Sequence, residues 1–313
     1  MDAGISATVD VRGLTRRFGD RPAVQDLTFS VGRGELFGLV GPDGAGKTTT
    51  LRMLAGVLRP SGGDAFLGGT SVALDPERVK KRIAYMSQRF GLYADLTVIE
   101  NINFYADLYE VPRGERPARL ERLFHFSNLG PFRDRLAGKL SGGMKQKLGL
   151  SCALIHQPEI LLLDEPTFGV DPVSRRDLWL IVHEMVAQGV TTVVSTAYMD
   201  EAERFDRVAF LDRGRLIALE TPEALQRTLQ NRVLAVRTSE PRRAREAAIR
   251  LAAVSRAAVS GDSLRLIVGD AHRDAGVIGA ALRAAGVPVH EIGPASVAFE
   301  DVFIDRMTGG AEP

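Results

Sequence analysis

The sequence is poor in cysteine and in long hydrophobic runs. Cys152 is the only cysteine among 313 residues, so an internal disulfide cannot form. No charged segment leading into an apolar one opens the chain, and we therefore expect a cytosolic rather than a secreted protein. The most apolar runs, residues 36–40 and 160–163, are far shorter than the roughly 20 residues that span a bilayer. We expect a chain that does not cross a membrane by itself.

An excess of charge of one sign is also lacking. The chain has 40 lysine and arginine residues against 39 aspartate and glutamate residues, a formal net charge of +1. Binding to nucleic acid depends largely on basic side chains that neutralise phosphates, so this balance argues against a nucleic-acid partner. At about 150 residues per domain, the length suggests two domains.

The first predicted domain covers residues 1–230. From residue 8 onwards, short apolar runs alternate with amphipathic stretches, which is typical of an α/β domain with a mostly parallel sheet. Strand signals vanish between residues 98 and 140, where apolar residues take helical spacing, and we predict an inserted helical subdomain over about 95–155. The predicted strands are residues 36–40, 160–163, 192–195 and 208–211.

Residues 231–313 form the second predicted domain, a small α+β unit. Its pattern fits the βαββαβ order of ferredoxin-like folds. The segment carries no chemical motif, so we interpret it as an accessory or dimer-stabilising module. The predicted elements include apolar runs at 233–236, 263–268 and 287–292 and alanine-rich helical patterns at 242–253 and 275–285.

A glycine-rich segment follows the first of the predicted strands. Residues 41–48 fit the P-loop pattern of a glycine, four residues and Gly-Lys-Thr, between an apolar strand and a helix-compatible run. In a P-loop, backbone N–H groups and a helix N-terminus cradle a polyphosphate. Lys47 can reach the β- and γ-phosphate oxygens, and Thr48 can bind Mg²⁺. The residues predicted to contact ATP here are Gly41, Pro42, Asp43, Gly44, Ala45, Gly46, Lys47, Thr48 and Thr49.

Two carboxylates follow the strand predicted at residues 160–163. Asp164, at the carboxyl end of that strand, is placed to hold Mg²⁺, and Glu165 can polarise the water that attacks the γ-phosphate. An apolar strand that ends in acidic residues is common by itself. Its position after the P-loop favours a site that binds and hydrolyses a nucleotide.

A third motif, Leu-Ser-Gly-Gly-Met-Lys-Gln-Lys at residues 140–147, opens a helical pattern before Asp164. Ser141 could cap this helix, with Gly142 and Gly143 in its first turn. Together with the P-loop and the two carboxylates, the motif resembles the signature of ATP-binding-cassette (ABC) ATPases. The resemblance covers nearly all of residues 8–230 and implies the P-loop ABC-type α/β fold, with an antiparallel β subdomain.

The resemblance implies roles for further residues. Phe18 stands where the family has an aromatic residue that stacks on adenine, and Asp171 matches the family's D-loop. Gln88 matches the glutamine that touches Mg²⁺ and water and senses the transmembrane partner. By the same resemblance, the predicted catalytic residues are Glu165, Gln88 and Lys47, and the predicted Mg²⁺ ligands are Thr48, Gln88 and Asp164.

The family also implies a head-to-tail dimer of two cassettes. Each ATP then lies between the P-loop of one chain and residues 141–143 of the other, so that one chain owns two half-sites. The second cassette could be another copy of this chain or a different chain. In this scheme ATP closes the dimer and hydrolysis releases it.

One position departs from the family pattern. In ABC ATPases the strand after the D-loop helix ends in Ser-Thr-His, and the histidine contacts the γ-phosphate; here the run is Ser195, Thr196 and Ala197. An engineered inactivating substitution or natural degeneracy could explain Ala197. Residues 197–206 resemble the N-terminal cassette of tandem ABC proteins linked to multidrug efflux, which favours natural degeneracy. We expect normal ATP binding and slowed hydrolysis.

Three functions remain open at this point. The favoured one is the ATPase subunit of an ABC exporter, cytoplasmic and peripheral to the membrane, whose transmembrane permease is a separate chain. Residues 297–303 resemble the closing segment of drug-resistance-type subunits of the ABC-2 class, which favours export. The alternatives are a soluble ABC ATPase without a transporter and a nucleotide-regulated subunit with negligible catalysis, which Ala197 makes plausible.

Overall fold

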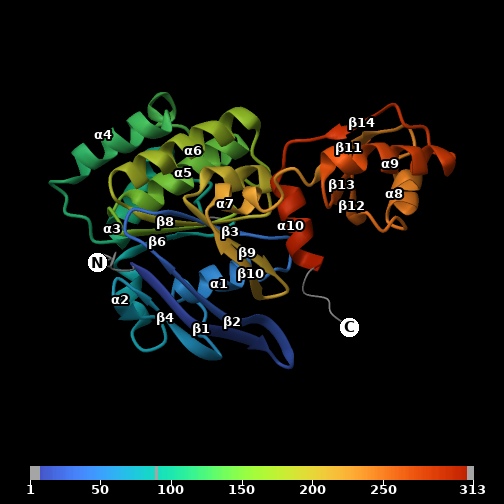
Figure 1. Ribbon diagram of the computed structural model, residues 1–313. Helices are drawn as coiled ribbons and strands as arrows, with labels where there is room; N and C mark the ends of the chain where they lie inside the picture. Colours follow the sequence, from blue (N-terminus) through green and yellow to red (C-terminus); the bar gives the residue numbers. More distant parts are fainter. Residues whose placement is uncertain (1–7, 89–90, 309–313) are drawn as a thin grey trace. The chain divides into compact units, whose positions relative to one another are not determined.

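Figure 1 shows the computed structural model of the chain, in which residues 8–88 and 91–308 are described. Residues 1–7 and 89–90 of the predicted domain 1–230, and residues 309–313 of the predicted domain 231–313, thus lie outside the described residues. The chain forms two compact units that divide between Leu219 and Glu220. Each unit has its own hydrophobic core. The boundary predicted after residue 230 stays a prediction.

The first unit is built around a six-stranded sheet of order β10-β9-β3-β8-β7-β6. From β9 to β6, neighbouring strands pair in parallel. β3, β7 and β8 are buried along their whole length, because both faces of a parallel sheet are covered. The mostly parallel sheet predicted from the sequence is confirmed. Its strands are β3 (Leu36–Val40), β6 (Ile83–Met86), β7 (Ile160–Asp164), β8 (Thr191–Thr196), β9 (Arg207–Asp212) and β10 (Arg215–Glu220).

A second sheet in the same unit has the order β2-β1-β4-β5 and antiparallel pairing. Along β1, Val9 and Val11 are buried while the residues next to them are more exposed, which is the pattern of a sheet with one covered face. This sheet is the antiparallel subdomain that the fold class includes. Its strands are β1 (Val9–Phe18), β2 (Arg21–Val31), β4 (Gly62–Leu67) and β5 (Thr70–Ser71).

Helices occupy most of residues 98–140, where the sequence shows no strand signals. Thr97 begins α3 with a capping box, in which its hydroxyl accepts the N–H of Glu100 and the Glu100 carboxylate accepts the N–H of Thr97. Contacts join α5 to α3, α4 and α6. The helices of this unit are α1 (Lys47–Leu54), α2 (Pro76–Lys80), α3 (Val98–Leu108), α4 (Arg116–Ser127), α5 (Gly142–Leu154), α6 (Pro172–Ala187) and the short η1 (Gly130–Phe132), η2 (Ala137–Lys139) and η3 (Met199–Arg204).

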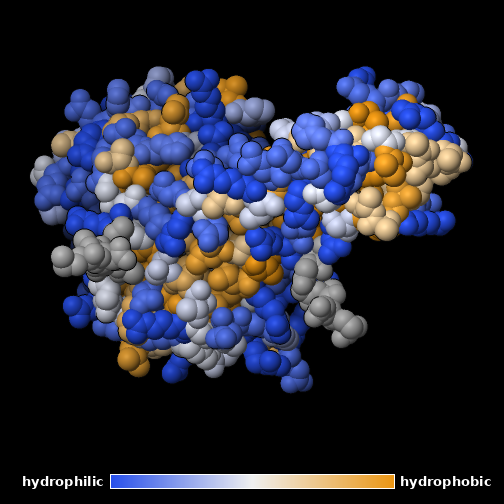
Figure 2. All heavy atoms as spheres, viewed as in Figure 1, coloured by the Kyte–Doolittle hydropathy of each residue, from blue (hydrophilic) through white to orange (hydrophobic). Residues whose placement is uncertain are grey.

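The surface of the first unit is mostly hydrophilic on the face that Figure 2 shows. A hydrophobic area lies over β9 and β10 in that view. Leu216 and Leu219 of β10 are only partly buried and pack against the core of this unit. None of the helices within residues 8–88 and 91–308 is long and apolar enough to span a membrane.

The second unit contains a four-stranded antiparallel sheet of order β12-β13-β11-β14. This order, with two helices packed on one face, is the ferredoxin-like arrangement predicted from the βαββαβ pattern. Its elements are α7 (Pro222–Arg227), β11 (Val233–Arg237), α8 (Pro241–Ala248), β12 (Val254–Ser260), β13 (Ser263–Val268), α9 (Ala271–Ala284), β14 (Glu291–Pro294) and α10 (Phe299–Thr308).

Two helix boundaries in this unit differ from the predicted ones. The pattern at 242–253 predicts a longer helix, but α8 ends at Ala248 because the chain must turn before β12 begins at Val254. Backbone hydrogen bonds from Leu251 and Val254 close that turn. α9 begins before the predicted residue 275, since Asp270 caps it by accepting the N–H of Arg273.

We predict that the stability of the first unit falls as the pH drops below about 6.5, the ordinary pKa of histidine. Burial lowers the pKa of the His156 imidazole, which stacks on Tyr109 at 3.9 Å between ring centroids. The Nε2–H donates to the Ile83 carbonyl, and the buried Nδ1 has no hydrogen-bond partner among the described residues. Protonation of Nδ1 therefore costs free energy only in the folded state.

The measurement is urea unfolding followed by the fluorescence of Trp179, the only tryptophan, at pH 7.5 and pH 5.5. The unfolding midpoint of His156→Phe should change less between these two pH values than that of the unaltered protein. His125→Gln, an exposed histidine of α4, is the matched control and should keep the full change. Equal pH dependence in His156→Phe and the unaltered protein would contradict the prediction.

Candidate functional site

The glycine-rich loop between β3 and α1 has the shape that its sequence predicts. Gly46 begins α1 with a φ of +100°, and a Cβ atom there would lie 2.7 Å from the Ala23 carbonyl oxygen. A Cβ atom on Gly41 would lie 2.2 Å from the Leu211 carbonyl oxygen. Only glycine fits at both positions. The loop thereby directs the N-terminal N–H groups of α1 to the carboxyl edge of the parallel sheet.

Lys47 is only 4% exposed, although it carries a full charge. Its Nζ atom donates to the carbonyl oxygens of Gly41, at 2.7 Å, and Pro42, at 3.1 Å. The same atom lies 3.1 Å from Oε1 of Glu165. The P-loop lysine and the carboxylate predicted to activate water are therefore an ion pair.

Asp164 is the last residue of β7 and is 1% exposed. Its Oδ1 atom accepts hydrogen bonds from Thr48 Oγ1, at 2.9 Å, and from Ser195 Oγ, at 2.7 Å. The Tyr85 hydroxyl lies 3.4 Å from Oδ2, and burial together with the Asp164 charge raises the pKa of Tyr85 to about 12. The buried carboxylate is thus surrounded by hydroxyl donors.

Glu165 leaves the strand with a φ of +49°, which turns its side chain toward the P-loop. Its backbone N–H donates to Ser195, at 3.0 Å from Oγ and 3.1 Å from the carbonyl oxygen. Gln88 Nε2 donates to Glu165 Oε2 at 3.1 Å. The structure therefore brings Lys47, Gln88 and Glu165 together, as the sequence predicts.

A cavity of about 920 Å³ lies against the P-loop. Phe18 stands at its margin, 51% exposed, with the Arg16 guanidinium carbon 4.7 Å from the centroid of the ring. The predicted residues that line the cavity are Phe18, Asp43, Gly44, Ala45, Gly46, Lys47, Thr48, Thr49, Gln88 and Glu165. The lining residues that the sequence analysis missed are Arg21, Pro22, Ala23, Gln25, Phe168 and Arg213.

The residues of the signature and of the D-loop, by contrast, are not among those that line this cavity. Ser141 caps α5, and its exposed hydroxyl accepts the N–H of Met144. Asp171 caps α6 by accepting the N–H of Ser174, and this hydrogen bond lowers the pKa of the Asp171 carboxyl. A Cβ atom on Gly143 would lie 2.2 Å from Ser174 Oγ. The signature and the D-loop of one chain are therefore neighbours, with Gly142 at the exposed start of α5.

Ala197 directly follows β8. The carbonyl oxygen of Thr196 accepts the N–H of Gly41 at 3.3 Å, so the chain reaches Ala197 beside the P-loop. The Thr196 hydroxyl donates to Glu201, a buried carboxylate that also accepts the indole N–H of Trp179. The five histidines lie outside β8 and η3, on or next to other elements: His125, His156, His183, His272 and His290.

Sequence reasoning missed Ser195 and Tyr85 as partners of Asp164. Ser195 could have been found, because the predicted strand 192–195 ends there and parallel strands place their carboxyl ends side by side. The register of β7 and β8 indeed sets Asp164 opposite Ser195. No motif marks Tyr85, which lies on the edge strand β6.

Comparison with known proteins agrees with this geometry. A family model described as ABC transporter matches residues 24–168. The probable multidrug ABC transporter ATP-binding protein YbhF of Escherichia coli is 44% identical over 97% of this chain, which spans about half (52%) of YbhF. The Nod factor export ATP-binding protein I of Burkholderia thailandensis is 34% identical, with 97% of both chains covered.

Two further comparisons concern a drug-resistance protein and a solved structure. The daunorubicin/doxorubicin resistance ATP-binding protein DrrA of Streptomyces peucetius is 37% identical over 79% of this chain and 75% of its own. A structure described as the ATP binding subunit of an ABC transporter has a TM-score of 0.65 and 31% identity, and covers 71% of this chain and 93% of its own. The chain therefore belongs to the ATP-binding proteins of the ABC transporter family.

Proposed function

We propose that the chain binds ATP in the P-loop cavity and hydrolyses it to energise an ABC exporter. The observation that carries this proposal is the convergence of Lys47, Thr48, Gln88, Asp164 and Glu165 at the carboxyl edge of the parallel sheet. A phosphate-binding loop, a hydroxyl-bonded carboxylate and a second carboxylate are the parts that phosphoryl transfer to water requires.

The P-loop holds the phosphates of ATP. The backbone N–H groups of the loop and the N-terminus of α1 attract anionic oxygens, and Lys47 adds a buried positive charge. Phe18 offers an exposed ring face for stacking of the adenine base. This arrangement binds one compact anion locally, which agrees with the net charge of only +1.

The donor atoms present fit Mg²⁺. Thr48 Oγ1 and Asp164 Oδ1 are hard oxygen ligands that already lie 2.9 Å apart, and Gln88 adds an amide oxygen at the same edge of the cavity. Thr48, Gln88 and Asp164 are therefore the residues that would hold the ion. When bound, the ion would supply positive charge that neutralises the phosphates.

Glu165 accepts the proton of the attacking water in this proposal. Its backbone is fixed by Ser195, and Gln88 holds one of its carboxylate oxygens, so the carboxylate is positioned by three neighbours including Lys47. A positioned general base contributes typically 10²–10⁴-fold to a rate. The transferred phosphoryl group needs little other covalent help from the protein.

The active unit is a head-to-tail dimer in this proposal. Ser141 and Gly142 are exposed and do not line the P-loop cavity of their own chain, which suits contact with the ATP of a second cassette. The N-terminus of α5 then adds donors to the γ-phosphate when the dimer closes. Asp171, next to Gly143, lies at the same surface. The second cassette is another copy of this chain or a related chain.

The transport role rests on the relatives. Those named above are described as acting in multidrug transport, Nod factor export and drug resistance. By analogy, this chain acts with a separate transmembrane permease on the cytoplasmic face of a membrane. The degenerate position Ala197 supports a second candidate, a nucleotide-regulated subunit with negligible catalysis, because alanine has no group to contact the γ-phosphate.

We expect Ala197→His to raise steady-state ATP hydrolysis by about 10²-fold, because the imidazole adds a contact to the γ-phosphate at the end of β8. The hydrolysis rate is measured as phosphate release by the purified full chain, and the ATP affinity is measured with a fluorescent nucleotide. ATP affinity should change little.

The matched control is the double variant Ala197→His with Lys47→Ala, which should show no gain in hydrolysis. If Ala197→His alone leaves turnover unchanged, the missing histidine does not limit the rate. Turnover that stays at background in both the unaltered protein and the single variant would favour the nucleotide-regulated subunit.

We expect Glu165→Gln to trap an ATP-dependent dimer. The substitution keeps the size of the side chain but removes the carboxylate that lies 3.1 Å from Lys47 Nζ, so ATP binds and is not cleaved. Size-exclusion chromatography with ATP and Mg²⁺ should shift the protein from the mass of one chain to that of two.

Ser141→Arg in the Glu165→Gln background is the control for the head-to-tail geometry. It places a bulky charge at the exposed start of α5 without altering the P-loop cavity, and we expect this double variant to elute as a monomer. A dimer that forms equally without ATP, or that survives Ser141→Arg, would contradict the proposed arrangement.

We also expect a membrane-spanning chain to co-purify with the tagged protein from detergent-extracted membranes of its native host. Mass spectrometry identifies the chains that are retained, and a second cassette found there would make the dimer heteromeric. Recovery of the protein in association with ribosomes instead, with no membrane chain retained, would support the non-transport alternative.

A further inference from the structure

A second cavity, of about 780 Å³, lies in the first unit at the edge of the central sheet opposite the P-loop. Glu159 and Thr191, at the amino ends of β7 and β8, line it, whereas Asp164 and Thr196 stand at the carboxyl ends of the same strands. The other walls come from the β2–β3 loop, from α4, from the C-terminal ends of α5 and α6, and from Thr8, the β4–β5 turn and Arg82.

Positive charge dominates this cavity. Four arginines line it against a single acidic residue, Glu159. Arg82 pairs with Glu159 and also donates to the Gly68 carbonyl. Arg119 donates to the Ile155 carbonyl at the end of α5 at 2.9 Å and pairs with Glu115, the residue directly before α4. Two of the four guanidinium groups are therefore used to hold the fold.

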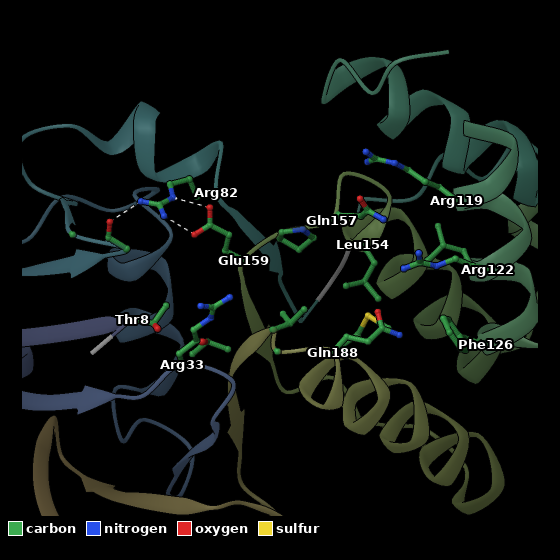
Figure 3. Close-up of a pocket in the computed structure, with 18 residues that line it drawn as sticks. Thr8, Arg33, Arg82, Arg119, Arg122, Phe126, Leu154, Gln157, Glu159 and Gln188 are labelled. Carbon is green, nitrogen blue, oxygen red and sulfur yellow. Dashed lines mark hydrogen bonds and ion pairs between the residues drawn. The ribbon is translucent and has the colours of Figure 1, made fainter. Parts of the chain in front are cut away.

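The guanidinium groups of Arg33 and Arg122 do not hold the fold in this way. Within residues 8–88 and 91–308, neither side chain has a hydrogen bond or an ion pair. Figure 3 shows the two guanidinium groups directed into the cavity from opposite walls, Arg33 from the β2–β3 loop and Arg122 from α4. Two positive charges without a partner among the described residues thus face one open cavity.

Apolar side chains form part of the wall. Leu123 and Phe126 of α4, Leu154 of α5 and Met185 of α6 all line the cavity. Gln157 and Gln188 add two amide groups beside them. The volume lies within the roughly 300–1,000 Å³ of small-molecule sites, and the wall offers about as much polar as apolar surface, which suits a ligand that carries both kinds of group.

We propose that this cavity binds a small organic anion. Arg33 and Arg122 attract its phosphate or carboxylate group from the two walls, and its apolar body packs against Leu123 and Phe126. The planar guanidinium fork matches both kinds of oxyanion. The C-terminal ends of α5 and α6 oppose an anion with about half a charge each, which two full positive charges outweigh.

The proposed site is distinct from the P-loop cavity. The five residues of β7 separate Glu159, which lines the second cavity, from Glu165, which lines the P-loop cavity, a length of about 17 Å at 3.3 Å per residue. The two cavities share no lining residue. Occupation of the second cavity can therefore be measured in a chain whose P-loop is disabled.

The test is isothermal titration of the full chain with 1-naphthyl phosphate, 1-naphthoate and the uncharged 1-naphthol. We expect one of the two anions or both to bind, at least tenfold more tightly than 1-naphthol, and Lys47→Ala to leave that affinity unchanged. Arg33→Gln and Arg122→Gln should each weaken binding of the anion about tenfold. Arg113→Gln, an exposed arginine outside the cavity, is the matched control and should have no effect.

The comparison of the two anions tells whether the site prefers a phosphate or a carboxylate. Equal binding of 1-naphthol would show that only the apolar wall acts, and loss of binding in Lys47→Ala would place the probe in the P-loop; either overturns the proposal. An anion affinity that neither Arg33→Gln nor Arg122→Gln reduces would also overturn the proposal. Since both arginines are exposed and unpaired in the described chain, circular dichroism of these variants should match that of the unaltered protein.

Discussion

The parallel pairing of β7 with β8 is the constraint on which the nucleotide site depends. Its register sets Asp164 opposite Ser195, so that one serine donates to the buried carboxylate and accepts the backbone N–H of Glu165. A slip by one residue would turn Asp164 to the other face of the sheet. Thr48 and Lys47 reach these two carboxylates from α1 only because β3 lies on the other side of β8.

Much of this arrangement could be predicted from the sequence because the signals are local. Residues 36–40 and 160–163 are apolar throughout, so they had to be strands of a covered parallel sheet, and the motifs that follow them lie at one edge of that sheet. The ferredoxin-like order of the second unit could also be read from alternating runs. The P-loop residues and Glu165 were placed together for the same reason.

What could not be predicted depends on contacts between distant segments. Tyr85 reaches Asp164 from an edge strand that carries no motif, and Arg213 reaches the P-loop cavity from the turn between β9 and β10. Arg33 and Arg122 are ordinary surface arginines in the sequence, and only the fold makes them face one cavity. The end of α8 at Ala248 is set by the turn into β12 and not by helix propensity.

The hydrogen-bond partners of Lys47 bear on the order of events when a nucleotide binds. An ammonium group has three protons, and the carbonyls of Gly41 and Pro42 and the Glu165 carboxylate already engage them. A phosphate that binds the Lys47 ammonium group must displace one of these acceptors. The bound nucleotide therefore replaces an existing hydrogen-bond partner of the lysine. If Glu165 is the acceptor that leaves, the carboxylate is released toward water in the same step that secures the substrate. Binding of ATP and release of the Glu165 carboxylate from Lys47 are then a single event.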